Sequence, residues 1–185
     1  MILSKINLSL FKAINSYAGV NPLIDHIAIL IAQYMPILFI AYLLYLWFKD
    51  NKSYRNYVLF SSYAAIIGLL INFIISLIYF HPRPFVLHLG KDLIIHNSDT
   101  SFPSDHTTFM LSIAIMLMYF KKTYKIGIVL TVFGIIGGMA RVFCGIHFPF
   151  DIIGSLLVSI VASFIIYMLK NKLLYLNKLI IQFIF

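Results

Sequence analysis

Five apolar runs separated by short polar loops constrain the fold of this chain more than any other feature. They cover residues 23–48, 57–80, 103–120, 124–141 and 151–169. A run of about 20 apolar residues can cross a bilayer as a helix, which satisfies its own backbone hydrogen bonds. Because 62% of the 185 residues are hydrophobic and only 11% are charged, a soluble domain of this length could not bury the apolar side chains.

These runs predict an all-α, polytopic membrane helical bundle that forms one domain over residues 1–185. We expect about five transmembrane helices and an interfacial helix at each end. The first interfacial helix lies within residues 1–20, where apolar side chains recur at helical spacing, and the second covers residues 170–185. Gly134 and Gly138 are spaced as in helices that pack closely in membranes.

The distribution of the basic residues explains the net charge of +8 without a nucleic-acid partner. The loops 49–56 and 121–125 and the C-terminal segment hold nine of the 14 Lys and Arg residues. Basic residues concentrate on the cytoplasmic side of membrane proteins. The other side then receives the loops 81–103 and 142–150, which carry most of the remaining polar residues.

Ionisable side chains lie at helix boundaries on this second, non-cytoplasmic side. They are Arg83, His106, Arg141, His147 and Asp151. Such groups are costly near a membrane and indicate function unless they anchor the helices at the interface. Two arginines can bind a phosphoryl group bidentately, and the start of the run at Pro103–Ser104 offers backbone N–H groups and a hydroxyl to an anion.

His147 and Asp151 stand four residues apart. A carboxylate that binds one imidazole nitrogen fixes the tautomer and leaves the other nitrogen nucleophilic. His106 is a candidate for the acid that protonates the leaving oxygen. These residues predict a two-step phosphoryl transfer that needs no metal and no cofactor. A metal site is the alternative, because several histidines share this face, but no HExxH spacing and no Glu is present.

Three motifs resemble the signature of the type 2 phosphatidic acid phosphatase superfamily. They are Arg83-Pro84, Pro103-Ser104-Asp105-His106 and Arg141-x5-His147-x3-Asp151. The resemblance implies a helical bundle with its site near the membrane surface and a phosphohistidine intermediate. It implies that His147 is the nucleophile, that Asp151 orients it and that His106 is the acid/base. It also implies that Arg83, Ser104 and Arg141 bind the phosphate. We expect Asp105, which follows Ser104 in the second motif, to belong to the same phosphate-binding group.

The chain departs from the family pattern at three positions. Ser76 stands at the position of the family lysine, Asp105 replaces a glycine and Ala140 replaces a serine. The missing lysine and the segments around Arg83 and His106 resemble the bacitracin-resistance type of bacterial undecaprenyl-diphosphatases. Lys91 and His81 are the candidates for replacing the lysine.

The expected activity is hydrolysis of undecaprenyl diphosphate to undecaprenyl phosphate and inorganic phosphate, as part of cell wall biogenesis. The expected partners are a polyprenyl diphosphate lipid and the bilayer of the bacterial cytoplasmic membrane, with the site facing the cell exterior. The alternatives are a phosphatase for phosphatidate, phosphatidylglycerol phosphate or lipid A, and a lipid transporter. A transporter would carry charges deep within its spans. The sequence does not define the oligomeric state.

Overall fold

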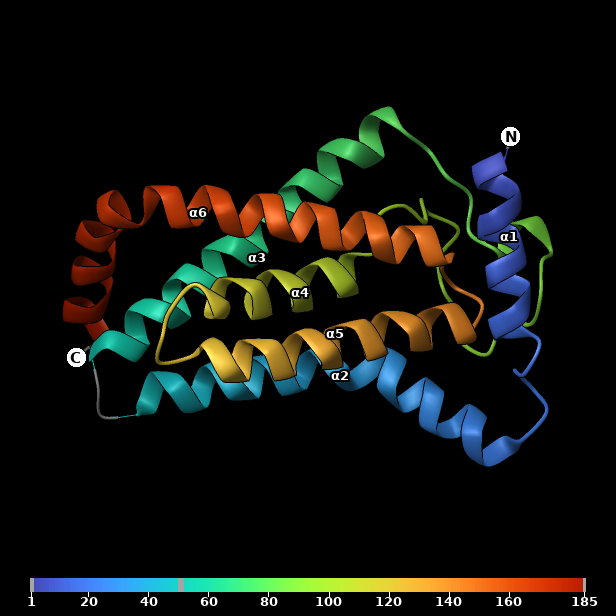
Figure 1. Cartoon of the computed structure of the whole chain (residues 1–185), viewed down its shortest axis with the longest axis horizontal. Helices are drawn as coiled ribbons and strands as arrows, with labels where there is room; N and C mark the ends of the chain where they lie inside the picture. The colour runs from blue at the N-terminus through green and yellow to red at the C-terminus, as the bar shows by residue number, and fades with distance from the viewer. Residues whose placement is uncertain (1, 50–51, 185) are drawn as a thin grey trace.

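The computed structural model describes residues 2–49 and 52–184 and is shown in Figure 1. Residues 1, 50, 51 and 185, which belong to the expected N-terminal helix, first basic loop and C-terminal segment, lie outside the described residues. The elements are α1 (Ile2–Asn15), α2 (Pro22–Phe48), α3 (Lys52–Ile78), η1 (Phe85–Leu87), α4 (Asp105–Met118), α5 (Tyr124–Phe143) and α6 (Pro149–Ile184). The described ranges contain no strand, so the predicted all-α fold is confirmed.

Four of the described helices, namely α2, α3, α5 and α6, are long and apolar enough to cross a membrane. Large apolar side chains such as Leu77 and Leu157 are exposed on their outer surfaces. That surface suits lipid and would be unfavourable in water. The chain is therefore an integral membrane protein, as its apolar runs predict.

The helix α4 is shorter than the run that predicts it. The prediction starts the helix at Pro103, whereas the structure starts it at Asp105 with Ser104 as the N-cap. Its 14 residues correspond to about 21 Å at 1.5 Å per residue, less than the roughly 30 Å of a hydrocarbon core. Figure 1 shows α4 in the middle of the bundle, ending short of α5 and α6. The segment between α3 and α4 can therefore fold into the end of the bundle.

Close contacts around α4 depend on glycines of α5. A Cβ added at Gly134 would lie 2.8 Å from Leu111 Cδ2 of α4. A Cβ at Gly138 would lie 2.9 Å from Ile152 Cγ2 of α6 and 3.0 Å from Thr107 Oγ1 of α4. These glycines bring three helices together as expected from their spacing.

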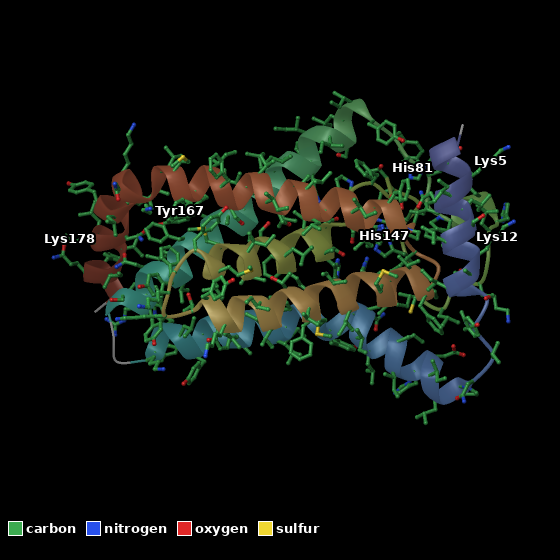
Figure 2. All side chains as sticks on the ribbon, in the orientation of Figure 1. Lys5, Lys12, His81, His147, Tyr167 and Lys178 are labelled. Atoms are coloured by element: carbon green, nitrogen blue, oxygen red, sulfur yellow. The ribbon has the colours of Figure 1, made fainter. Side chains whose placement is uncertain are left out.

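The connections of the bundle lie at two opposite ends. Figure 1 shows α1 and the α3–α4 and α5–α6 connections at one end, and the α4–α5 connection and the C-terminus at the other. The α4–α5 connection (Figure 1) and Lys178 (Figure 2) therefore lie at the end opposite to His147. The predicted separation of the basic segments from the site residues is confirmed for these two segments.

The N-terminal helix α1 lies across one end of the bundle (Figure 1) and packs on it more closely than an interfacial helix requires. Phe11 is fully buried against Phe148, and the buried Asn15 donates to Lys91 O and Phe143 O at 2.8 Å each. Ile6 and Leu10 remain exposed. One face of α1 thus covers the candidate site, and the other presents apolar side chains.

The helix α6 does not end at 169, where the predicted span ends. It continues to Ile184, and Figure 1 shows its C-terminal part turning away from the line of the first part. The predicted C-terminal segment is thus a bent continuation of α6 and not a separate helix.

Candidate active site

The start of α6 places His147 and Asp151 beside each other. Phe148 is the residue before the helix, and Pro149 takes the first helical position, where its missing N–H costs no hydrogen bond. The Phe148 N–H donates to Asp151 Oδ2 at 2.7 Å, and the Asp151 N–H donates back to Phe148 O at 3.0 Å. The bond from the Phe148 N–H to the Asp151 carboxylate is the side-chain half of a capping box, because the return bond goes to a backbone oxygen. It turns the carboxylate back over the residue that precedes the helix.

The carboxylate of Asp151 therefore meets the imidazole of His147, and both side chains are buried. His147 Nδ1 lies 3.3 Å from Asp151 Oδ2, and the same oxygen accepts the hydroxyl of Ser101. A carboxylate oxygen can only accept, so the proton of the neutral ring is on Nδ1. The lone pair of Nε2 is then free to act as a nucleophile.

Arg83 lies on the other side of the His147 ring. Its Nη1 is 3.1 Å from His147 Nε2 and donates to Ile146 O at 3.0 Å. Its Nε donates to Asp99 Oδ1 at 2.7 Å. The Arg83 side chain is 7% exposed and that of Asp99 is 58% exposed. A buried guanidinium next to the nucleophilic nitrogen is thus held by an anion from the surface.

Arg141, in the last turn of α5, is the second buried cation of the site. Its Nη1 donates to Ala32 O of α2 at 3.1 Å, and its Nη2 lies 3.4 Å from His96 Nε2. Its Nε has no hydrogen-bond partner within the described residues. Arg141 therefore keeps donor capacity for a ligand.

The start of α4 supplies the other predicted residues. Ser104 is buried, and its hydroxyl accepts from Thr107 Oγ1 at 3.1 Å. His106 is half-buried, and the charges of Arg141 and Arg83 act on it. Asp105 instead accepts from Asn72 Nδ2 of α3 at 2.8 Å. The contact that the structure gives Asp105 ties α4 to α3 and involves no cation of the site.

The position of the missing family lysine offers no substitute cation. The Ser76 hydroxyl donates to Phe73 O of its own helix at 2.7 Å. Lys91 is exposed, and its side chain lies next to Gly19, close to α1. His81 lies near Asp151, with Nδ1 at 3.7 Å from Oδ1. The histidine of the α3–α4 loop that reaches an arginine of the site is His96, beside Arg141.

The loop between α3 and α4 thus contributes side chains that the sequence pattern did not single out: His96, Asp99 and Ser101. They belong to the predicted polar loop 81–103, where the sequence pattern assigns them no role. No spacing signal marks them, because they reach the site through the path of an irregular segment and not through a helical period. A density of polar residues before Pro103 was the one signal that could have pointed to them.

The surroundings of His147 favour its neutral form. Burial, followed by the charges of Arg141 and Arg83, holds the pKa of His147 well below its ordinary 6.5. Burial likewise lowers the pKa of His96. Among residues 2–49 and 52–184, no three His, Cys, Asp or Glu side chains are grouped so that they could hold a metal ion. The arrangement can supply a neutral nucleophilic imidazole, a carboxylate that orients it and two buried cations.

Figure 2 shows where the site lies in the bundle. His147 and His81 are at the end that α1 covers, with Lys5 and Lys12 on α1 beyond them. Lys178 and Tyr167 are towards the other end. The candidate site is therefore enclosed at one end of the bundle.

Known proteins are similar to this chain over most of its length. The model of the PAP2 superfamily matches residues 56–175. Undecaprenyl-diphosphatase BcrC of Bacillus subtilis is 39% identical over 168 residues, which are 91% of this chain and 86% of that protein. The putative undecaprenyl-diphosphatase YbjG of Escherichia coli is 29% identical over 86% of this chain and 80% of its own. The crystal structure of Aquifex aeolicus LpxE has a TM-score of 0.71 at 23% identity and covers 88% of this chain and 95% of its own.

Proposed function

Since the chain belongs to the PAP2 superfamily, we propose that it is a membrane lipid-pyrophosphate phosphatase that hydrolyses undecaprenyl diphosphate. The products are undecaprenyl phosphate and inorganic phosphate. The similarity to BcrC, at 39% identity over 91% of the chain, supports the choice of substrate.

One geometric observation carries the reaction class. His147 Nε2 is unprotonated and lies 3.1 Å from a guanidinium nitrogen of Arg83, while Nδ1 is held by Asp151 at 3.3 Å. A phosphoryl group that binds Arg83 is thereby brought to the nucleophilic nitrogen. Guanidinium groups also neutralise the charge that spreads over the phosphoryl oxygens during transfer.

The proposed reaction has two steps. In the first, His147 Nε2 bonds to the terminal phosphorus, the bond from that phosphorus to the bridging oxygen breaks, and His106 protonates the leaving undecaprenyl phosphate. In the second, His106 accepts a proton from water, the water oxygen attacks the phosphohistidine, and inorganic phosphate leaves. Arg83 must turn from Nε2 to the phosphoryl oxygens before the first step, because the attack needs the Nε2 lone pair.

The distribution of charge supports a site that faces the cell exterior. The site lies at the end that α1 covers, whereas Lys178 and the α4–α5 connection lie at the opposite end (Figures 1 and 2). In a bacterial cytoplasmic membrane, the end rich in lysine faces the cytoplasm. We place the protein in that membrane, as one domain over residues 1–185.

A substrate panel tests the proposed function. Protein purified in detergent is assayed for phosphate release from polyprenyl diphosphate, phosphatidate and phosphatidylglycerol phosphate, with EDTA present. We expect the highest kcat/KM with polyprenyl diphosphate. A preference for either glycerolipid would assign a different substrate, and no release from any lipid would contradict an enzymatic function.

The acid side of the pH profile provides a second expectation. The attacking form needs a neutral His147 and an ionised Asp151, so activity is lost as the pH falls through whichever of the two protonations occurs first. Burial and the two arginines hold the pKa of His147 well below 6.5, so we expect its imidazole to stay neutral while the acidic limb of kcat/KM reports Asp151. Assays from pH 4 to 9, with recovery checked after return to pH 7, measure the limb, and the ¹⁵N shifts of the His147 ring over the same range show whether the imidazole titrates with it. An imidazole that becomes protonated at or above pH 6.5 would contradict the depressed pKa of His147.

Removing the charge of Asp99 should strengthen phosphate binding. Its carboxylate occupies Arg83 Nε at 2.7 Å, where a substrate oxygen would compete with it. The Asp99 side of this pair is 58% exposed, and ion pairs at a surface are worth about 0.2–1 kcal/mol, which corresponds to roughly a one-and-a-half- to fivefold change in affinity. We expect Asp99→Asn to lower KM and the inhibition constant of inorganic phosphate within that range. Asp92→Asn, which removes an exposed charge from the same loop, is the matched control. A higher KM in Asp99→Asn would show instead that Asp99 prepares Arg83 for substrate.

A further inference from the structure

The hydrogen bonds of Asp151 are gathered on one of its two oxygens. Oδ2 accepts from Phe148 N, from Ser101 Oγ and, at 3.3 Å, from His147 Nδ1. Oδ1 has no hydrogen-bond partner within the described residues, although the Asp151 side chain is only 1% exposed. A buried acceptor without a donor is destabilising, and more so when it is charged. Oδ1 therefore requires a donor.

His81 presents a donor group to this oxygen. Its Nδ1 lies 3.7 Å from Asp151 Oδ1 and is itself buried without a hydrogen-bond partner in the described part of the chain. Two orphaned polar atoms thus face each other at a distance that a small rotation of the ring would reduce to a hydrogen bond.

The surroundings of His81 hold its ring in this direction. The ring is stacked on Tyr79 at 6.0 Å and lies 5.3 Å from Phe148 on the other side. The backbone N–H of His81 donates to Thr100 Oγ1 at 3.2 Å, and the backbone O of His81 accepts from Ser101 N at 2.7 Å. The same short stretch therefore holds His81 and delivers the Ser101 hydroxyl to Asp151.

We propose that His81 is a positioning residue that donates Nδ1–H to Asp151 Oδ1, so that Asp151 is held between two histidines. This inference rests on the proposed function, because it assigns to His81 a role in orienting the nucleophile. A hydrogen bond to a carboxylate favours its ionised form. The ionised carboxylate accepts from His147 Nδ1 and keeps the lone pair on Nε2. Burial lowers the pKa of His81, so the donor is a neutral imidazole.

A cavity of about 410 Å³ opens beside the pair. Tyr79, Phe102 and Phe150 line it together with His81 and Asp151, and α1 contributes Ser4 and Asn7. A cavity of this size that contains the polar groups of His81, Asp151, Ser4 and Asn7 can hold water. Neither His147 nor Arg83 lines it. Water in this cavity can therefore reach His81 from a side that the two residues of the phosphate site do not line.

Substitutions at His81 distinguish a side chain that donates a hydrogen bond to Asp151 from one that only fills the space. An Asn side chain places its amide N–H near the position of Nδ1, whereas Leu fills the space and donates nothing. A hydrogen bond to a charged group, worth about 1.5–3 kcal/mol, corresponds to roughly a 10- to 150-fold effect. We expect His81→Leu to lower kcat by about that factor with little change in KM, and His81→Asn to retain most of kcat.

The pH profile adds a readout that loss of packing would not move. The ionisable groups that face Asp151 are His147, Arg83 and His81, and α1 contributes the uncharged Ser4 and Asn7 to the cavity. Loss of one donor disfavours the ionised carboxylate. The acidic limb of kcat/KM should therefore move to higher pH in His81→Leu and stay in place in His81→Asn. His88→Leu, at an exposed histidine of the same loop, should change neither kcat nor the limb.

A measurement without turnover keeps the inference apart from the proposed function. In protein labelled with ¹⁵N-histidine, a hydrogen bond from Nδ1–H to a carboxylate gives a strongly downfield proton. We expect two such protons in the native protein, one from His147 and one from His81. The His81 proton should be missing in His81→Asn, and both should be lost in Asp151→Ala. If the native protein turned over no lipid pyrophosphate, the proposed function would fail while this signal still decided the contact. Native kcat and an unmoved limb in His81→Leu, or the absence of the downfield proton of His81, would overturn the inference.

Discussion

Replacing His147 with alanine is expected to abolish turnover of polyprenyl diphosphate, with kcat lowered by about a thousandfold or more. The variant keeps Arg83 and Arg141 but has no atom to receive the phosphoryl group. Binding should survive, so inorganic phosphate should still protect the variant against thermal unfolding. The measurement is phosphate release in detergent, alongside the unfolding midpoint with and without phosphate.

Trapping of the intermediate gives this prediction a chemical signature. With substrate labelled in its terminal phosphate, the native protein should acquire an acid-labile, base-stable label, as a phosphohistidine does. His147→Ala should acquire none, and His88→Ala, at an exposed histidine of the α3–α4 loop, should be labelled as the native protein is. Residual turnover above a few per cent in His147→Ala would remove His147 from the role of nucleophile.

The substitution Asp151→Asn is expected to lower kcat by about a hundred- to ten-thousandfold. An amide can still approach His147 Nδ1, but its NH₂ group favours the tautomer that protonates Nε2 and so removes the nucleophilic lone pair. KM should change little, because the arginines that bind phosphate remain.

The effect on folding should be much smaller than the effect on turnover. The amide oxygen of asparagine can still accept from Phe148 N, the bond that Asp151 makes at 2.7 Å. Loss of a cap costs about 0.5–2 kcal/mol, and partial retention costs less. Asp92→Asn controls for the change of net charge. An Asp151→Asn variant with kcat within tenfold of the native value would show that the carboxylate does not select the tautomer.

Much of the fold follows from the sequence because membrane spans have few alternatives. A span must be a helix of a given length, so the apolar runs predict α2 and α5 closely. The predicted start of α3 at residue 57 is wrong, because the helix begins at Lys52 and includes the end of the predicted basic loop 49–56. The start of α4 is misplaced by two residues because Pro103 precedes the N-cap instead of opening the helix. The bent continuation of α6 could not be predicted, since its lysines are compatible with both a helix and an interface.

The residues of the candidate site also fall into those that the sequence predicts and those that it does not. His147 and Asp151 are predictable because four residues across a helix start bring two side chains together. Asp99 and Ser101 are not, because their contacts depend on how a loop of irregular conformation folds back over α4. Asn7 and Asn15 of α1 were also overlooked. A pattern search that follows apolar positions ignores amides that satisfy buried backbone groups, as Asn15 does for Lys91 and Phe143.

The short α4 affects which measure of substrate concentration applies to this protein. The helix α4 is roughly 9 Å shorter than the hydrocarbon core that its neighbours cross. The site at the start of α4 therefore lies deeper in the bundle than the ends of the longer helices. A prenyl chain can then remain dissolved among the acyl chains while its diphosphate is cleaved. The encounter is two-dimensional, and the quantity that saturates the enzyme is the mole fraction of substrate in the membrane or micelle.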